Sequence, residues 1–120
     1  MLAFLRKTAL WIMLIPSTIF SLGVASNQAV TIANGDRFPV LLSAGKIHQI
    51  PSLTIDPDGV AMLDDIHCVM TPQTHLNALA DIFDEGGMCS IGDFMLDLGS
   101  WLFSYAFIVW LTVLILRVRD

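Results

Sequence analysis

Residues 98–116 read LGSWLFSYAFIVWLTVLIL, nineteen residues without a charge, and Arg117-Val118-Arg119 follows them. An α-helix rises about 1.5 Å per residue, so about 20 apolar residues cross a hydrocarbon core of about 30 Å. We therefore expect a transmembrane helix here. Directly before it, Ser90 and Asp93 lie three residues apart. This spacing predicts a capping box at the start of the helix, with Asp in the position that Glu usually takes.

A second apolar segment lies near the N-terminus, from Thr8 to Ala25, behind the basic pair Arg6-Lys7. Two interpretations are open. A secretory signal would be cleaved after Gly23-Val24-Ala25, whereas a retained segment would be a second transmembrane helix. The 18 residues exceed a usual signal core and favour retention. The composition agrees with a membrane protein, because 14% of the residues are charged, against about 25% in soluble proteins.

Charge is distributed unevenly along the chain. Segment 27–97 contains ten acidic residues and two basic ones, whereas the outer ends of the apolar segments carry Arg6, Lys7, Arg117 and Arg119. Lys and Arg next to transmembrane helices mark the cytoplasmic side. We therefore expect both termini in the cytoplasm and residues 27–97 outside it. The acidic segment also excludes nucleic acid as a partner, because nucleic-acid binding depends on a basic surface.

The middle of the chain is expected to be mostly irregular. Asn34-Gly35-Asp36 is a turn signal, and Phe38-Pro39-Val40-Leu41-Leu42 is an apolar patch that we expect on the membrane surface or against a neighbouring helix. Thr71-Pro72 fits a helix start and Gly86-Gly87 a helix end. Between them apolar residues recur at helical spacing, which predicts a short amphipathic helix at about 72–85, lying at the membrane interface.

Together these features predict an all-α membrane protein with two transmembrane helices, joined by a mostly irregular extracytoplasmic segment that carries the amphipathic interfacial helix. Residues 1–26 would form the first transmembrane helix, or an uncleaved signal anchor. Residues 27–89 would form the acidic extracytoplasmic segment, and residues 90–120 the capped second helix with its basic cytoplasmic tail. Ser100 and Ser104, four residues apart, are expected to pack closely against another helix.

Three blocks of sequence occur in order: Ala33-Asn34-Gly35-Asp36-Arg37-Phe38-Pro39-Val40, then His75-Leu76-Asn77-Ala78-Leu79-Ala80-Asp81-Ile82, then Ser90-Ile91-Gly92-Asp93. In these blocks the chain resembles a family of small bacterial integral membrane proteins known only as a domain of unknown function. Its members carry an Asn-Gly-Gly-x-Met-Pro loop, a Leu-x-x-Leu-Ala-Asp-Ile segment and Ser-Ile-Gly-Asp before the last helix, usually with further spans upstream. The chain departs from this pattern at Asp36 and Phe38. The resemblance implies a protein of the bacterial cytoplasmic (inner) membrane and implies no activity.

The two cysteines of the chain, Cys68 and Cys89, are expected outside the cytoplasm. A disulfide between them would close a loop around the predicted amphipathic helix and stabilise the fold by about 3 kcal/mol. The alternative is two unpaired, buried thiols.

Asp64, Asp65, His67 and His75 lie close together in the sequence and could form the centre of a metal site, which Cys68 could join only if it did not form the disulfide. Their spacing fits no zinc pattern, so we expect no metal site.

Asp93 and Asp97 lie on one helical face, where paired carboxylates handle protons or cations in some membrane proteins, although capping accounts for Asp93. Without a nucleophile motif or a phosphate-binding loop, we expect no catalytic residue, no cofactor and no enzyme activity.

The sequence therefore predicts an accessory or interaction subunit of a larger membrane protein complex, whose partners are the lipid bilayer and other integral membrane subunits. Six residues are expected to contact the partner: Phe38, Pro39, Leu41, Leu76, Leu79 and Phe83. The alternative is a self-oligomerising transport or ion-handling membrane protein with Asp93 and Asp97 at its outer mouth.

Overall fold

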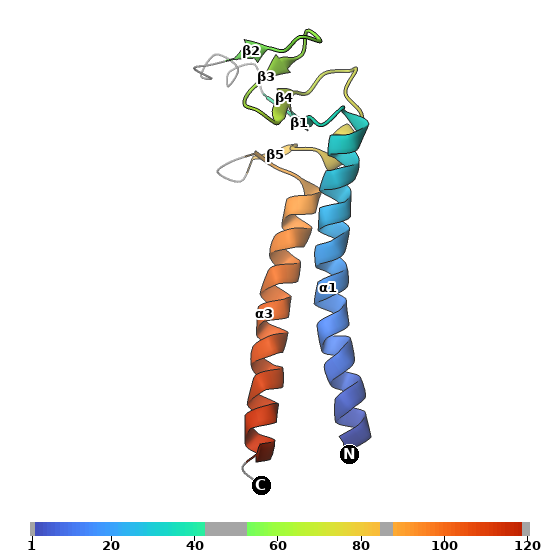
Figure 1. The fold of residues 1–120 in the computed structure, drawn as a ribbon, viewed down its shortest axis with the longest axis vertical. Helices are drawn as coiled ribbons and strands as arrows, with labels where there is room; N and C mark the ends of the chain where they lie inside the picture. The colour runs from blue at the N-terminus through green and yellow to red at the C-terminus, as the bar shows by residue number, and fades with distance from the viewer. Residues whose placement is uncertain (1, 43–52, 85–87, 119–120) are drawn as a thin grey trace.

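The computed structural model describes residues 2–42, 53–84 and 88–118. Two long helices, α1 (Leu2–Ala33) and α3 (Ile91–Val118), lie side by side and run in opposite directions, so both chain termini lie at one end (Figure 1). We call this pair the stem. The described residues between the two helices form a small head at the other end. The molecule is elongated, with extents of 66 × 25 × 20 Å.

Small residues bring the two helices of the stem together. α3 buries Gly92, Gly99 and Ala106 at intervals of seven residues. A Cβ atom on Gly99 would lie 2.7 Å from the backbone nitrogen of Phe20, and one on Gly23 would lie 2.7 Å from the backbone oxygen of Gly92. The two backbones therefore touch at these glycines. A repeat of about seven residues is the spacing of left-handed helix pairs, and small residues permit such close approach.

The head contains two small sheets. The larger has four strands, β1 (Phe38–Val40), β2 (Thr54–Ile55), β3 (Ala61–Met62) and β4 (His67–Val69), in the order β1-β4-β3-β2. β1 and β4 are parallel, and the other neighbours are antiparallel. After the 3-10 helix η1 (Asn77–Leu79), strands β5 (Phe83–Asp84) and β6 (Met88–Cys89) form an antiparallel hairpin that leads into α3.

A small apolar core attaches the head to the stem. Val30, near the end of α1, is buried together with Phe38 of β1 and Ala80, and Met70 and Leu79 pack against this cluster. A core of this size supplies little stabilisation by itself, because burial of apolar area is the main favourable contribution. The polar contacts between head and stem therefore matter for how the two parts are held together.

The prediction of an all-α protein with two transmembrane helices is wrong. The head contains β-sheets, and among the described residues only Ile91–Ile115 of α3 is long and apolar enough to cross a membrane. The strands have two or three residues each, which is too short to show an alternating pattern. Pro39 does not prevent pairing, because β1 is an edge strand. α1 also continues past the expected boundary at residue 26, to Ala33.

The prediction of an amphipathic helix at about residues 72–85 is also wrong, since this segment forms η1 and β5. Leu76 has a φ of +55°, which interrupts any continuous right-handed helix. The side chains of Thr74 and Asn77 donate to the carbonyl oxygen of Thr71 at 2.7 and 3.2 Å. Such local bonds give the backbone an alternative to a helix.

The predicted disulfide is absent as well. Cys68 lies in β4 and Cys89 in β6, two different sheets, and they are not bonded to each other. Cys68 is buried in the larger sheet, where it pairs with Pro39 of β1 and Met62 of β3. The turn predicted at Asn34-Gly35-Asp36 is confirmed, because both Gly35 and Asp36 have a φ of +63° at the end of α1.

Candidate functional site

The three sequence blocks meet where the head joins the stem. Asn34, just after α1, links the first block to the second: its side-chain amide donates to the carbonyl oxygen of His75 at 2.9 Å, and its side-chain oxygen accepts from the backbone N–H of His75 at 2.8 Å. The backbone N–H of Asp81 donates to the carbonyl oxygen of Pro39 at 3.2 Å, and its carbonyl oxygen accepts from Leu41 at 2.8 Å. These bonds hold the second block against α1 and β1.

The third block joins the two helices through polar contacts. Asp93, in the first turn of α3, accepts from the backbone N–H of Ser90 (2.8 Å), the Ser90 hydroxyl (2.7 Å) and the side-chain amide of Asn27 on α1 (2.8 Å). The backbone N–H of Asp93 donates to Ser90 Oγ at 3.1 Å, so the two residues have the reciprocal bonds of a capping box. We call Asn27, Ser90 and Asp93 the junction network.

A second carboxyl group lies close enough to interact with this network. Asp81 is 6% exposed, and its Oδ1 has no hydrogen-bond partner among the described residues. Burial raises the pKa of the Asp81 carboxyl, and the negative charge of Asp93 raises it further, whereas His67 acts in the opposite direction. Burial and a neighbouring like charge both disfavour the ionised form.

Arg37 ties the turn between β2 and β3 to the end of α1. Its guanidinium pairs with Asp56 at 2.6 Å and also with Asp58. Hydrogen bonds from the backbone of Val60 and Asp58, together with the charge of Arg37, hold the pKa of Asp56 below its usual value despite partial desolvation. Because two carboxylates engage the guanidinium, Arg37 serves this turn rather than an incoming anion.

Asp64 organises the turn between β3 and β4. The backbone N–H groups of His67 and Ile66 donate to its Oδ1 at 2.8 and 2.9 Å, and His67 Nδ1 lies 2.7 Å from its Oδ2. These bonds, the one from the His67 backbone most of all, lower the pKa of Asp64 to about 2.

This carboxylate predicts a response to strong acid. Because the pKa of Asp64 is depressed in the folded state, its contribution to stability is present above the ordinary value of 3.8 and is lost as the pH falls through about 2. We expect Asp64→Asn to remove this acid step and to lower the free energy of unfolding at neutral pH by about 1 kcal/mol. Thermal unfolding between pH 2 and 6 measures both effects, with Asp65→Asn as the matched control. An unaltered acid step in Asp64→Asn would contradict the assignment.

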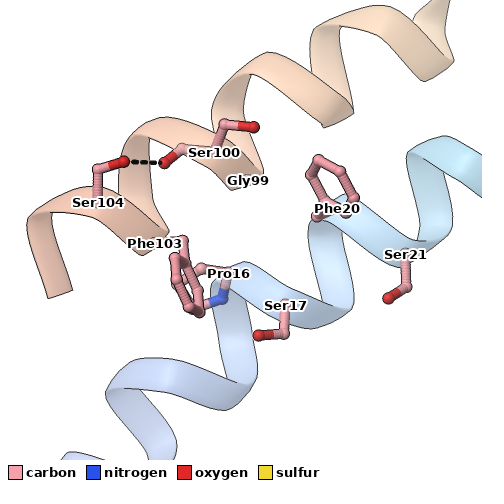
Figure 2. Close-up of a pocket in the computed structure, with 8 residues that line it drawn as sticks. All are labelled: Pro16, Ser17, Phe20, Ser21, Gly99, Ser100, Phe103 and Ser104. Carbon is pink, nitrogen blue, oxygen red and sulfur yellow. Dashed lines mark hydrogen bonds between the residues drawn. The ribbon is translucent and has the colours of Figure 1, made fainter. Parts of the chain in front are cut away.

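An open groove of about 430 Å³ runs along the stem between α1 and α3 (Figure 2). It is lined by Pro16, Ser17, Phe20, Ser21, Gly99, Ser100, Phe103 and Ser104. Ser100 and Ser104 are exposed, and the Ser104 hydroxyl donates to the carbonyl oxygen of Ser100 at 2.9 Å. The close helix contact expected at these two serines is made instead by Gly99, next to Phe20.

A more polar pocket of about 520 Å³ opens in the head, between the end of α1, β3, β4 and the turn at residues 71–75. Cys68 lines it, but burial raises the pKa of this thiol, so it is protonated at neutral pH and is a poor nucleophile. Across residues 2–42, 53–84 and 88–118, no group of three or more His, Cys, Asp and Glu side chains could hold a metal ion. Of the four candidate ligands, Asp64 and His67 contact each other.

The six residues expected to contact a partner fall into two groups. Three pack inside the head: Phe38 and Pro39 are buried, and Leu79 is partly buried against the apolar core. Phe38 and Pro39 stabilise the fold and are not accessible to a partner, which corrects the prediction for them. The other three are exposed: Leu41, Leu76 and Phe83. The Phe83 ring also packs edge-to-face against Phe94 of α3, with the ring centroids 5.4 Å apart.

The sequence profile described as "Family of unknown function (DUF5317)" matches residues 4–115. The chain belongs to this family. The DUF5317 match includes both helices of the stem and all of the head, so the junction between them lies within the family's own unit. No curated protein and no solved structure matches the chain. The resemblance to an uncharacterised family is thus confirmed at the level of the family.

Sequence reasoning missed Asn27 and Asp81 as members of the site. The sequence pattern puts Asn27 at the start of an irregular segment, whereas it lies inside α1, four residues after Gly23 and on the face that meets α3. Asp81 lies within the segment predicted as an amphipathic helix, which does not form. One signal was available for Asp81: it follows the small residue Ala80 in a short apolar stretch, where an acidic residue is unusual.

Proposed function

We propose that the chain is a membrane-anchored interaction subunit of a larger membrane protein complex, without catalysis of its own. α3 supports the anchor, because its apolar stretch Ile91–Ile115 is mostly exposed: 11% of an 18-residue apolar window within it is buried inside the chain. Exposed apolar side chains occur along it, among them Leu98, Trp101 and Ile108. Such a surface suits contact with lipid tails or with other membrane helices.

The charge distribution supports one orientation for this anchor. Arg117 and Arg119 follow the apolar stretch of α3 in the sequence, and Arg6-Lys7 belongs to the first turns of α1, which begins at the end of the stem where α3 ends (Figure 1). Basic residues at a span end favour the cytoplasm. We therefore propose that this end faces the cytoplasm of a bacterial inner membrane and that the acidic head lies outside it.

One residue of the head carries the interaction proposal. Leu76 has φ +55° and ψ +33°, and its side chain is 45% exposed. A left-handed backbone costs a residue with a Cβ about 1–2 kcal/mol, and Asn or Gly adopts it more easily. The exposed leucine also gains little from burial. Leu76 therefore combines an unfavourable backbone conformation with an exposed apolar side chain. Such a combination is typical of a functional position, and we propose that Leu76 contacts a partner.

Leu76→Asn separates binding from folding. We expect the free energy of unfolding to rise by about 1 kcal/mol, because Asn tolerates the left-handed backbone. We expect partner retention to fall about tenfold or more, as for loss of an apolar anchor at an interface. Extraction in a mild detergent through a C-terminal tag, followed by mass spectrometry, identifies proteins retained in near-equal amounts. Ile55→Asn, at a residue 65% exposed in β2, is the matched control.

Two outcomes would overturn this proposal. If Leu76→Asn retained the partner as well as the unaltered chain, Leu76 would not be the contact. A pure homo-oligomer would instead favour a self-oligomerising transport or ion-handling protein, which ion flux into liposomes tests directly. The contacts of Asp93 favour a structural role for this residue, since its carboxylate accepts three hydrogen bonds within the chain.

A further inference from the structure

The buried carboxyl group of Asp81 has a position that none of the contacts above explains. It lies at the junction of head and stem and is buried, with 6% of the residue exposed. Its Oδ1 has no hydrogen-bond partner among the described residues. We propose that Asp81 is a proton-binding site, and that the bound proton holds the head on the stem. This inference does not depend on the proposed interaction function.

The backbone fixes Asp81 in this position. Its N–H donates to Pro39 and its carbonyl oxygen accepts from Leu41, so Asp81 forms a parallel bridge with Val40 of β1. Ala80, the residue before it, is fully buried against Val30 of α1. These contacts hold the backbone of residues 80–81 against β1 and the stem, with the Asp81 carboxyl group buried.

The surroundings of Asp81 favour a neutral group. The charged and titratable groups that act on it are Asp93 of α3 and His67 of β4. His67 already bonds with Asp64 at 2.7 Å. Asn27 and Ser90 direct their donors to Asp93 and stabilise its negative charge. β1 (Phe38–Val40) contributes no titratable side chain.

No Lys or Arg side chain in the described part of the head neutralises Asp81. Arg37 is the one such residue there, and Asp56 and Asp58 engage it. On α1, Ser26 Oγ is a second buried atom without a partner among the described residues. A proton taken up from solvent converts the Asp81 carboxylate to a carboxylic acid, removes its repulsion with Asp93, and leaves a hydroxyl group that can donate.

The direction of the pH effect follows from this uptake. Because the pKa of Asp81 is raised in the folded chain, the unfolded chain releases this proton at a lower pH than the folded chain does. The free energy of unfolding therefore falls as the pH rises through the folded-state pKa of Asp81. Above it, the ionised group favours separation of residues 80–81 from β1. The backbone N–H of Leu41, which donates to Asp81, should then lose protection from hydrogen exchange.

The test compares the full chain with Asp81→Asn in detergent micelles, with Asp65→Asn as the control for loss of one exposed carboxylate. We expect the melting temperature of the unaltered chain to fall by about 5 °C more than that of Asp81→Asn as the pH rises from the ordinary pKa of 3.8 to about 8. The protection factor of the Leu41 amide should fall over the same range only where Asp81 is present. The infrared band of a protonated carboxylic acid that persists above pH 3.8 in the unaltered chain should disappear in Asp81→Asn.

Two results would overturn the proposal. One is a pH profile and infrared spectrum that Asp81→Asn leaves unchanged, which would show that Asp81 stays ionised. The other is a stabilisation at pH 8 that depends on sodium and is absent when choline replaces it at equal ionic strength. In that case an alkali cation, and not a proton, would occupy the site.

Discussion

Gly99→Leu is expected to separate the two helices of the stem and to lower the free energy of unfolding by about 3 kcal/mol or more. Even a Cβ atom at this position would lie 2.7 Å from the backbone nitrogen of Phe20 and 2.9 Å from its Cα. Backbone atoms cannot move aside as a flexible side chain does, so the helices themselves must part. Thermal unfolding in detergent micelles, followed by near-ultraviolet circular dichroism, measures the change.

A nearby residue provides the control for Gly99→Leu. Trp101 is 78% exposed on the same turn of α3 and does not line the groove between the helices, so Trp101→Leu places a leucine there without crowding α1. Its effect should stay within about 0.5 kcal/mol. If the two variants unfolded alike, the close contact at Gly99 would not hold the stem together.

Some features of the stem can be predicted from the sequence and others cannot. The apolar length of α3 and the capping residues Ser90 and Asp93 can be predicted, because each depends on local sequence. The face by which α3 meets α1 was assigned to Ser100 and Ser104, whereas Gly92 and Gly99 make the contact. The serine spacing and the glycine spacing both fit a helix interface, and only the partner helix decides between them.

The head was harder to predict because its structure depends on distant partners. β1 pairs with β4, about 30 residues later, and β1 alone has three residues. Leu76, Leu79 and Phe83 show helical spacing, yet local bonds at Thr71 and Thr74 and the left-handed backbone of Leu76 prevent a helix. Periodicity over a dozen residues therefore gave the wrong element, since tertiary contacts outweigh a weak local preference.

Asp93→Ala should lower the free energy of unfolding by about 3 kcal/mol. The substitution removes the acceptor of three hydrogen bonds and leaves the Asn27 amide and the Ser90 backbone N–H without their partner. Each unpaired, partly buried donor costs about 1–3 kcal/mol, and loss of the helix cap adds to this. Asp97→Ala, one turn further along α3 at an exposed position, is the matched control. Equal unfolding of the two variants would show that the junction network does not stabilise the stem.

A double-mutant cycle with Asn27→Ala then decides what the network contributes. Gly92, Gly99 and Ala106 recur every seven residues, so sliding α3 by one repeat along α1 would still place small residues at the contact. The bond from Asn27 to Asp93 forms in one register alone. A coupling energy of about 1 kcal/mol or more would mean that this polar pair fixes the register and, with it, the position of the head. A coupling near zero would show that this polar pair does not fix the register.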